Sequence, residues 1–132
     1  MPEQPTRSRE EIFAEDGRYS IEAVDFIHEA LAYTVEELYG SQGSSGERRH
    51  VTGQQLCEGL RRLAIKKWGL LAREVLAHWG IYSTMDFGEI VFLLVNNGYL
   101  HKRPEDSIED FRDVYSFDEA FGCYEIPFKQ SA

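Results

Sequence analysis

The densest hydrophobic stretch of the chain runs from residue 68 to residue 100 and contains both tryptophans and the longest unbroken apolar run. Its first part carries apolar residues at helical spacing between Gly69 and Gly80, which predicts a short helix. Gly80 is suited to end that helix, because glycine readily adopts the left-handed conformation found after many helices. We expect the rest of the chain to pack around this stretch.

The longest apolar run, Ile90–Val95, lies in a second predicted helix from Ser83 to Asn97. Ser83 can cap this helix, and the carboxylate of Asp86 can reach back to a free N–H at the cap. A buried strand is the alternative, because the run is unbroken. We favour a helix, because the apolar residues keep the helical period and Asn97-Gly98 is a typical helix stop. A helix that is apolar on nearly all sides is expected to be buried.

Two longer helices are predicted before this stretch. Ser20 can cap the first, which has an apolar stripe, an acidic outer side and Gly40 at its end. Thr52 and Gln55 have the spacing of a capping box at the start of the second, which extends to Trp68. We expect both helices to turn their apolar sides inward.

The fold class that follows is mainly α, a compact bundle of about four main helices. A variant adds a short winged-helix-like β-hairpin near residues 99–117. The recognition helix of that variant, residues 83–97, contains no Lys or Arg and would repel phosphates. We expect one helical domain over residues 11–128, a flexible tail at residues 1–10 and a flexible Gly/Ser-rich loop at residues 40–46.

Composition and charge restrict the class of protein. The 132 residues carry a net charge of −9, which argues against bulk affinity for nucleic acid or for anionic membranes. No apolar run reaches the roughly 18 residues that suggest a membrane span, and the polar N-terminus predicts no signal peptide. Cys57 and Cys123 are far apart and form no CxxC motif, so we expect reduced, packing thiols in a cytoplasmic protein.

A resemblance to a known family rests on five segments: RRHVTGQQL, WG, HWGIYSTMDFGEIVFLLV, EDSIEDF and SFDEAF. These segments resemble a family of short, uncharacterised bacterial proteins over the range Arg18 to Phe121, and DFGEIVF is the most specific of them. The resemblance implies a single compact domain. It carries over no reaction and no catalytic residue.

One acidic group is the strongest candidate for catalysis or metal binding. Asp86 and Glu89 lie one helical turn apart at the start of a predicted helix, close in sequence to His78. Two carboxylates and a histidine can serve in acid–base chemistry or hold a metal, as in a small metal-dependent hydrolase. The alternative is structural, with Asp86 as a helix-cap partner and Glu89 as a solvated side chain. The group lacks the spacing of a metal motif, so we favour the structural alternative and expect no catalytic residue, metal or cofactor.

The charges are distributed unevenly along the chain. Residues 47–73 contain seven basic and two acidic residues, whereas residues 86–125 contain three basic and ten acidic ones. The functional hypothesis is a basic docking patch for an acidic protein or for structured RNA such as a ribosome surface. Its residues are Arg48, Arg49, Arg61, Arg62 and Lys66. The alternative is that the two regions neutralise each other by intramolecular pairing, or that the basic face is merely solvated.

The function predicted from the sequence is therefore binding to another macromolecule. We favour an adaptor-like, non-enzymatic interaction domain with a protein partner. A nucleic-acid- or ribosome-associated factor that uses the basic helix is the first alternative, and a small metal-dependent hydrolase is the second.

Overall fold

The computed structural model describes residues 6–40 and 50–122, and its helices lie close to where the hydrophobic pattern predicts them. The α-helices among these residues are α1 Arg9–Asp16, α2 Ile21–Tyr39, α3 Gly53–Trp68, α4 Ala72–His78 and α5 Thr84–Asn96. Shorter helical turns connect or follow them: η2 Gly69–Leu71, η3 Ile108–Phe111 and the π-helical turn η4 Asp118–Gly122. The described residues contain no strand, and the predicted mainly α fold is confirmed.

The starts of α3 and α5 are formed by the residues that the sequence indicates, whereas the predicted cap of α2 is not, because the Ser20 hydroxyl has no hydrogen-bond partner among the described residues. The Thr52 hydroxyl accepts a hydrogen bond from the Gln55 N–H at 3.1 Å, and the Gln55 side chain accepts one from the Thr52 N–H at 2.9 Å. At the start of α5, the Asp86 carboxylate accepts a hydrogen bond from the Ser83 N–H at 3.2 Å. These contacts satisfy N–H groups that have no partner within the helix, so local sequence alone defines where α3 and α5 begin.

The N-terminal helix α1 is not among the helices that the sequence predicts, and it begins inside the segment expected to be a tail. Ser8 and Glu11 form a reciprocal capping box, in which each side chain accepts a hydrogen bond from the other residue's N–H at 3.0 Å. Residues 9 and 10, which were expected in a flexible tail, therefore belong to a helix. The expected flexible loop at residues 40–46 lies outside the described residues except for Gly40, which ends α2.

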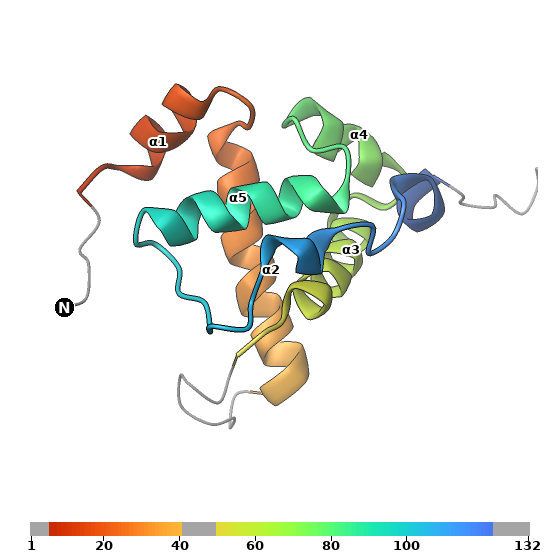
Figure 1. The fold of residues 1–132 in the computed structure, drawn as a ribbon. Helices are drawn as coiled ribbons and strands as arrows, with labels where there is room; N and C mark the ends of the chain where they lie inside the picture. The colour runs from red at the N-terminus through yellow and green to blue at the C-terminus, as the bar shows by residue number, and fades with distance from the viewer. Residues whose placement is uncertain (1–5, 41–49, 123–132) are drawn as a thin grey trace, which may run out of the picture.

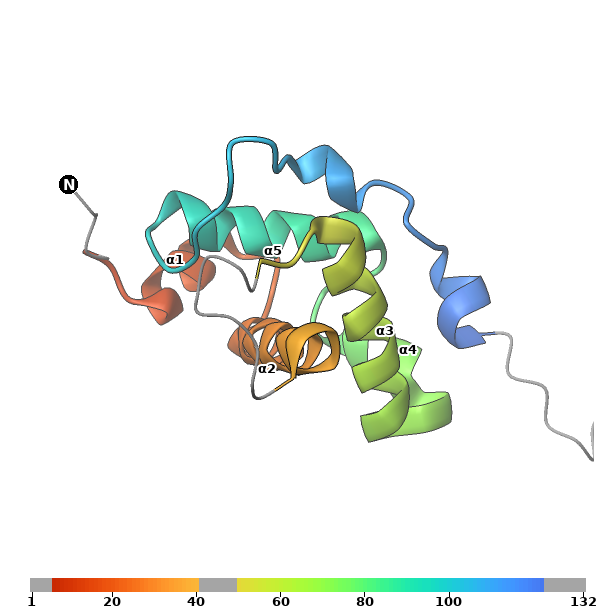
Figure 2. The same cartoon turned by 90° about the horizontal axis from the view of Figure 1, so that it is seen from below.

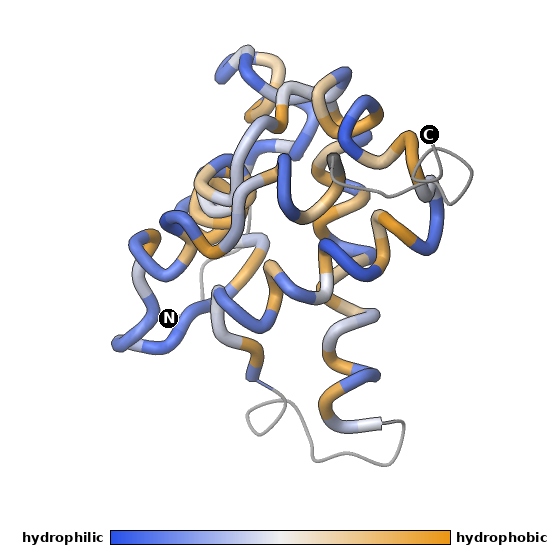
Figure 3. Tube along the Cα trace, turned by 90° about the vertical axis from the view of Figure 1, so that its right-hand side faces the viewer, coloured by the Kyte–Doolittle hydropathy of each residue, from blue (hydrophilic) through white to orange (hydrophobic). Residues whose placement is uncertain are grey.

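The helices form two layers. Figure 1 shows α5 lying across α2, and Figure 2 shows the two helices one above the other. Helix α3 packs beside α2, and the chain after α5 returns over α5 and α3, where η3 contacts both helices. Along the helices in Figure 3, hydrophobic and hydrophilic stretches alternate, as expected for amphipathic helices that bury one side. No helix in the described part of the chain is both long and apolar enough to span a bilayer.

The hydrophobic core is formed by side chains of α2, α3 and the hydrophobic stretch from residue 68 to residue 100. Its largest fully buried side chains include Val24, Ile27, Leu60, Leu76, Ile81, Phe87, Ile90 and Leu94. The two tryptophans, Trp68 and Trp79, are only half-buried and pack against each other and Phe26, with ring centroids 5.0–5.9 Å apart. Leu71 belongs to the apolar stretch around which the chain is expected to pack, yet it is 58% exposed because η2 interrupts the helical period before α4.

The alternative with a β-hairpin near residues 99–117 is wrong for the structure, because this segment contains a turn and the helical turn η3 but no strand. Asp106 accepts a hydrogen bond from the Arg103 N–H at 2.8 Å, which closes a turn around Pro104. Ser107 and Asp110 then form a capping box that starts η3. These local hydrogen bonds use the backbone groups that a strand ladder would require.

Phe111 holds η3 against the body of the protein. Its ring and Cβ occupy the space that side chains would fill on two glycines, because a Cβ on Gly53 or Gly88 would lie 2.8–2.9 Å from side-chain atoms of η3. The Thr84 hydroxyl donates a hydrogen bond to the Phe111 carbonyl at 2.6 Å. The segment after α5 is therefore fixed at one position over α3 and α5.

Candidate binding groove

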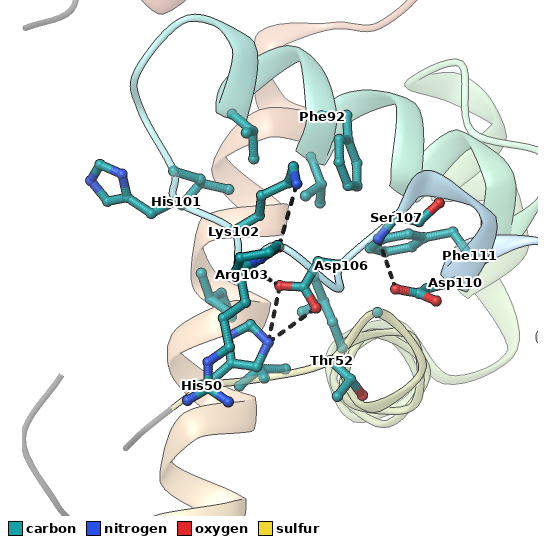
Figure 4. Close-up of a pocket in the computed structure, with 18 of the residues that line it drawn as sticks. His50, Thr52, Phe92, His101, Lys102, Arg103, Asp106, Ser107, Asp110 and Phe111 are labelled. Atoms are coloured by element: carbon teal, nitrogen blue, oxygen red, sulfur yellow. Dashed lines mark hydrogen bonds and ion pairs between the residues drawn. The ribbon is translucent and has the colours of Figure 1, made fainter. Parts of the chain in front are cut away.

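A groove of about 840 Å³ lies between α2, the start of α3, α5 and the segment from residue 100 to residue 111 (Figure 4). Its size is in the range of about 300–1,000 Å³ that is typical of ligand sites in proteins. Most of its wall is apolar and includes Leu31, Val35, Val91, Phe92, Val95 and Phe111. A second pocket, near Arg73 and Tyr82, has a volume of only about 310 Å³.

Helix α5 supplies one wall of the groove. Ile90 and Leu94 are fully buried in the core, whereas Val91, Phe92 and Val95 are half-buried and line the groove. The expectation that this helix is buried on nearly all sides therefore holds on one side only. Among the described residues, η3 covers only part of the other apolar side, at Phe92, and the rest of that side lines the groove.

Hydrogen bonds hold the polar edge of the groove in place. The imidazole Nε2 of His50 lies 3.1 Å from an Asp106 carboxylate oxygen, and both side chains are less than a fifth exposed. The Tyr39 hydroxyl donates a hydrogen bond to the His50 carbonyl at 2.6 Å. These contacts connect α2, the entrance of α3 and the segment that follows α5. A groove whose walls are fixed in this way loses little conformational entropy when it binds a ligand.

Three further charged side chains stand at the polar edge of the groove. Asp110 accepts a hydrogen bond from the Ser107 N–H at 3.0 Å. Lys102 and Arg103 are exposed, and the Lys102 ammonium donates a hydrogen bond to the Arg103 carbonyl at 3.3 Å. Figure 4 shows His101 pointing away from the groove, while the side chain of Lys102 extends along it toward Phe92.

Sequence reasoning missed this groove. Its wall residues belong to four separate segments, and no spacing along the chain indicates that they share one surface. One signal was available, because the predicted helix at residues 83–97 carries more apolar residues than a single core-facing side requires. That surplus was interpreted as burial, whereas part of it lines the groove.

The basic side chains expected on α3 are paired with carboxylates. Arg61 contacts Glu58 at 2.8 Å, and Arg62 contacts Glu37 of α2 at 3.0 Å and Glu58 at 3.3 Å. Hydrogen bonds from Arg61, and then from Arg62, lower the pKa of Glu58, so this carboxylate stays charged at neutral pH. These partners lie on α2 and α3 and not in the acidic region, residues 86–125, that the alternative named. Arg73 does pair with that region, at Asp118.

The expected basic patch also includes Lys66, Arg48 and Arg49. The Lys66 ammonium lies 5.7 Å from the centroid of the Tyr33 ring, in a cation–π geometry. Its neighbour Lys67 forms an ion pair with Glu29 of α2 at 3.0 Å. Arg48 and Arg49 lie outside the described residues. A docking role for this patch stays a prediction.

In the acidic candidate site, Asp86 accepts hydrogen bonds from neighbouring parts of the fold. The Asp86 carboxylate accepts hydrogen bonds from the Tyr19 hydroxyl at 2.5 Å, the Tyr82 N–H at 2.8 Å and the Ser83 N–H. Burial, and then the hydrogen bond to Asp86, raises the pKa of Tyr19 well above its usual range, so the phenol keeps its proton. Asp86 thus connects the start of α2 to the start of α5.

The other two members of this candidate site do not meet Asp86. Glu89 forms an ion pair with Arg18 at 3.4 Å. His78 is exposed at the end of α4 and makes no hydrogen bond or ion pair with either carboxylate. Within the described ranges, no three His, Cys, Asp or Glu side chains are grouped as metal ligands would be.

The variant Asp86→Asn is expected to lower the free energy of unfolding by roughly 1–3 kcal/mol, because the amide replaces a carboxylate that accepts three hydrogen bonds. Urea unfolding followed by circular dichroism measures this loss. Glu89→Gln is the control and should change stability by less than about 0.5 kcal/mol, since its ion pair is exposed. Equal effects of the two variants would contradict a structural role that is specific to Asp86.

Two buried titratable groups lie away from the groove. Burial raises the pKa of the Cys57 thiol to about 12, so the thiol stays protonated and unreactive at neutral pH. Burial, and then the charge of Arg9, lowers the pKa of His28, whose buried Nε2 has no hydrogen-bond partner. Neither group lines the groove, so neither contributes to the candidate site.

Comparisons of this chain with protein-family models, with curated proteins and with solved structures find no match. The resemblance to a bacterial family that the sequence segments suggest stays a prediction.

Proposed function

We propose that the protein is a non-enzymatic binding domain whose groove receives an amphipathic helix of a partner protein. The observation that carries this proposal is the apolar groove of about 840 Å³ between α2, α3, α5 and residues 100–111. Helix-in-groove recognition places apolar side chains of one helix, spaced three or four residues apart, into such a surface. The adaptor-like function and the cytoplasmic location expected from the sequence belong to the same proposal.

The chemistry of the groove favours binding over catalysis. Both of its carboxylates already accept hydrogen bonds from the protein, Asp106 from Arg103 and Asp110 from Ser107. The Thr52 hydroxyl is used as a helix cap. A general acid, base or nucleophile would need to be available to a substrate, whereas these groups maintain the walls.

A partner protein is favoured over a second copy of this chain. Each copy carries a net charge of −9, so two copies repel each other. A nucleic-acid partner is disfavoured because Arg61 and Arg62 are already paired with glutamates. The apolar walls of the groove also offer nothing specific to a phosphate backbone.

Selection of helical peptides from a displayed random library, followed by fluorescence anisotropy with the enriched peptide, tests the proposal. The variant Val95→Trp is expected to weaken binding at least tenfold, because the indole would fill the groove that Val95 lines. Leu70→Trp is the matched control and should bind within about twofold of the unmodified protein, since Leu70 is 56% exposed on η2 and lies outside the groove. Circular dichroism establishes that both variants are folded.

Two outcomes would overturn the proposed function. One is that no peptide is enriched over an unrelated acidic protein. The other is that the enriched peptide binds Val95→Trp as tightly as it binds the unmodified protein, because the peptide would then occupy another surface.

A further inference from the structure

We propose that the helix bound by the groove carries an acidic residue, Asp or Glu, beside its apolar anchors, and that this residue pairs with the ammonium of Lys102. This inference rests on the proposed function, because it specifies the chemistry of the partner for the same groove. It assigns a specificity role to Lys102, a residue that stands at the polar edge of the apolar walls.

The carboxylates of the groove already accept hydrogen bonds from the protein, so a basic partner would have to share them. Asp106 accepts hydrogen bonds from the Arg103 N–H at 2.8 Å and lies 3.1 Å from His50 Nε2. Asp110 accepts a hydrogen bond from the Ser107 N–H, which is part of the capping box of η3. A cation on the partner would compete with groups that maintain the groove itself. The negative charges at this edge are therefore directed toward the protein.

Lys102 differs from these carboxylates, because its charge is not paired with another charged group of the described residues. Most basic side chains in the described part of the chain form ion pairs with carboxylates, namely Arg7, Arg9, Arg18, Arg61, Arg62, Lys67, Arg73 and Arg112. Lys102 forms no ion pair with any carboxylate of the described residues, and its ammonium donates a hydrogen bond to the main-chain carbonyl of Arg103 at 3.3 Å. It is exposed and extends along the groove toward Phe92 (Figure 4).

The position of Lys102 gives the pairing a defined geometry. An apolar side chain of the partner that contacts Phe92 would bring the adjacent turn of its helix toward the Lys102 ammonium. A carboxylate on that turn would form an ion pair at the rim, whereas a lysine or arginine would be repelled. Charges at the rim of an interface contribute mainly to the choice of partner, and apolar anchors contribute most of the affinity.

The experiment uses the peptide enriched on the unmodified protein and three synthetic forms of it, with Glu, Gln or Lys at the acidic position nearest its apolar anchors. The variant Lys102→Glu is expected to weaken binding of the Glu peptide about fivefold, since a rim attraction becomes a repulsion. The same variant should bind the Lys peptide more tightly than the unmodified protein does. Lys67→Glu is the matched control, because Lys67 lies on α3 outside the groove and outside the expected basic patch, and it should leave the preference among the three peptides unchanged.

The outcomes separate the two proposals. Suppose that Val95→Trp blocks binding. If the enriched peptides then carry no acidic residue, or if Lys102→Glu does not reverse the preference for the Glu peptide over the Lys peptide, the charge inference is overturned and the groove function stands. If binding is insensitive to Val95→Trp, the groove function fails and the inference fails with it. Reversal of the preference by Lys102→Glu together with loss of binding in Val95→Trp supports both.

Discussion

Replacing Phe111 by alanine is expected to lower the free energy of unfolding by about 3–5 kcal/mol, the usual cost of removing a buried phenylalanine. Phe111 is 3% exposed, and its side chain fills the space left by Gly53 on α3 and Gly88 on α5. Neither glycine has a side chain that could move into the cavity, so the surrounding structure has little means of closing it. Urea unfolding at constant pH, followed by circular dichroism, measures the loss.

The variant Phe92→Ala is the control for this prediction. Phe92 contacts Phe111 with a centroid distance of 6.3 Å but is half-buried at the groove wall, so its truncation should cost less than the truncation of Phe111. A loss below about 1 kcal/mol for Phe111→Ala would contradict the placement of η3 against α3 and α5. The groove itself depends on that placement, because Phe111 forms part of its wall.

The variant Gly80→Ala is expected to lower the free energy of unfolding by about 3 kcal/mol, for two reasons. Gly80 has a φ of 94°, in the left-handed region that costs a residue with a Cβ about 1–2 kcal/mol. In addition, a Cβ at Gly80 would lie 2.2 Å from the Arg18 carbonyl oxygen, which belongs to the backbone and cannot rotate away. Thermal or urea unfolding of the purified variant measures the loss.

Gly17→Ala separates the two contributions. Gly17 also has a left-handed φ, 82°, but no heavy atom lies within 4 Å of its Cβ position. This variant should therefore lose only the conformational part, about 1 kcal/mol. Equal losses in the two variants would contradict the close approach between the turn after α4 and the turn before α2. That approach also includes the hydrogen bond from the Ser20 N–H to the Trp79 carbonyl at 3.3 Å.

The sequence by itself determined the helices, because their signals are local. Thr52 with Gln55 and Ser83 with Asp86 cap helices within a few residues of the chain, and each pair forms the contact that its spacing predicts. The period of the apolar residues distinguished a helix from a strand in the stretch Ile90–Val95. A helix start and a helical period require no knowledge of what packs against them.

The two candidate sites, Asp86 and the basic region, also differ in whether their contacts are local in the sequence. The structural alternative for Asp86 followed from its position at a helix start, and the hydrogen bonds from Ser83 and Tyr82 agree with it. The basic residues of α3, by contrast, found a partner on α2 that no prediction named. The contact between Arg62 and Glu37, 25 residues apart, could not be read from the order of residues.

Only the tertiary structure decided which apolar residues line the groove. The apolar residues of α5 look alike in the sequence, yet Ile90 and Leu94 are buried whereas Val91, Phe92 and Val95 line the groove. The difference arises from which sides of α5 are covered by α2 and by the segment around Phe111. Burial is a property of the neighbours of a residue, and those neighbours are set by long-range packing rather than by the local pattern.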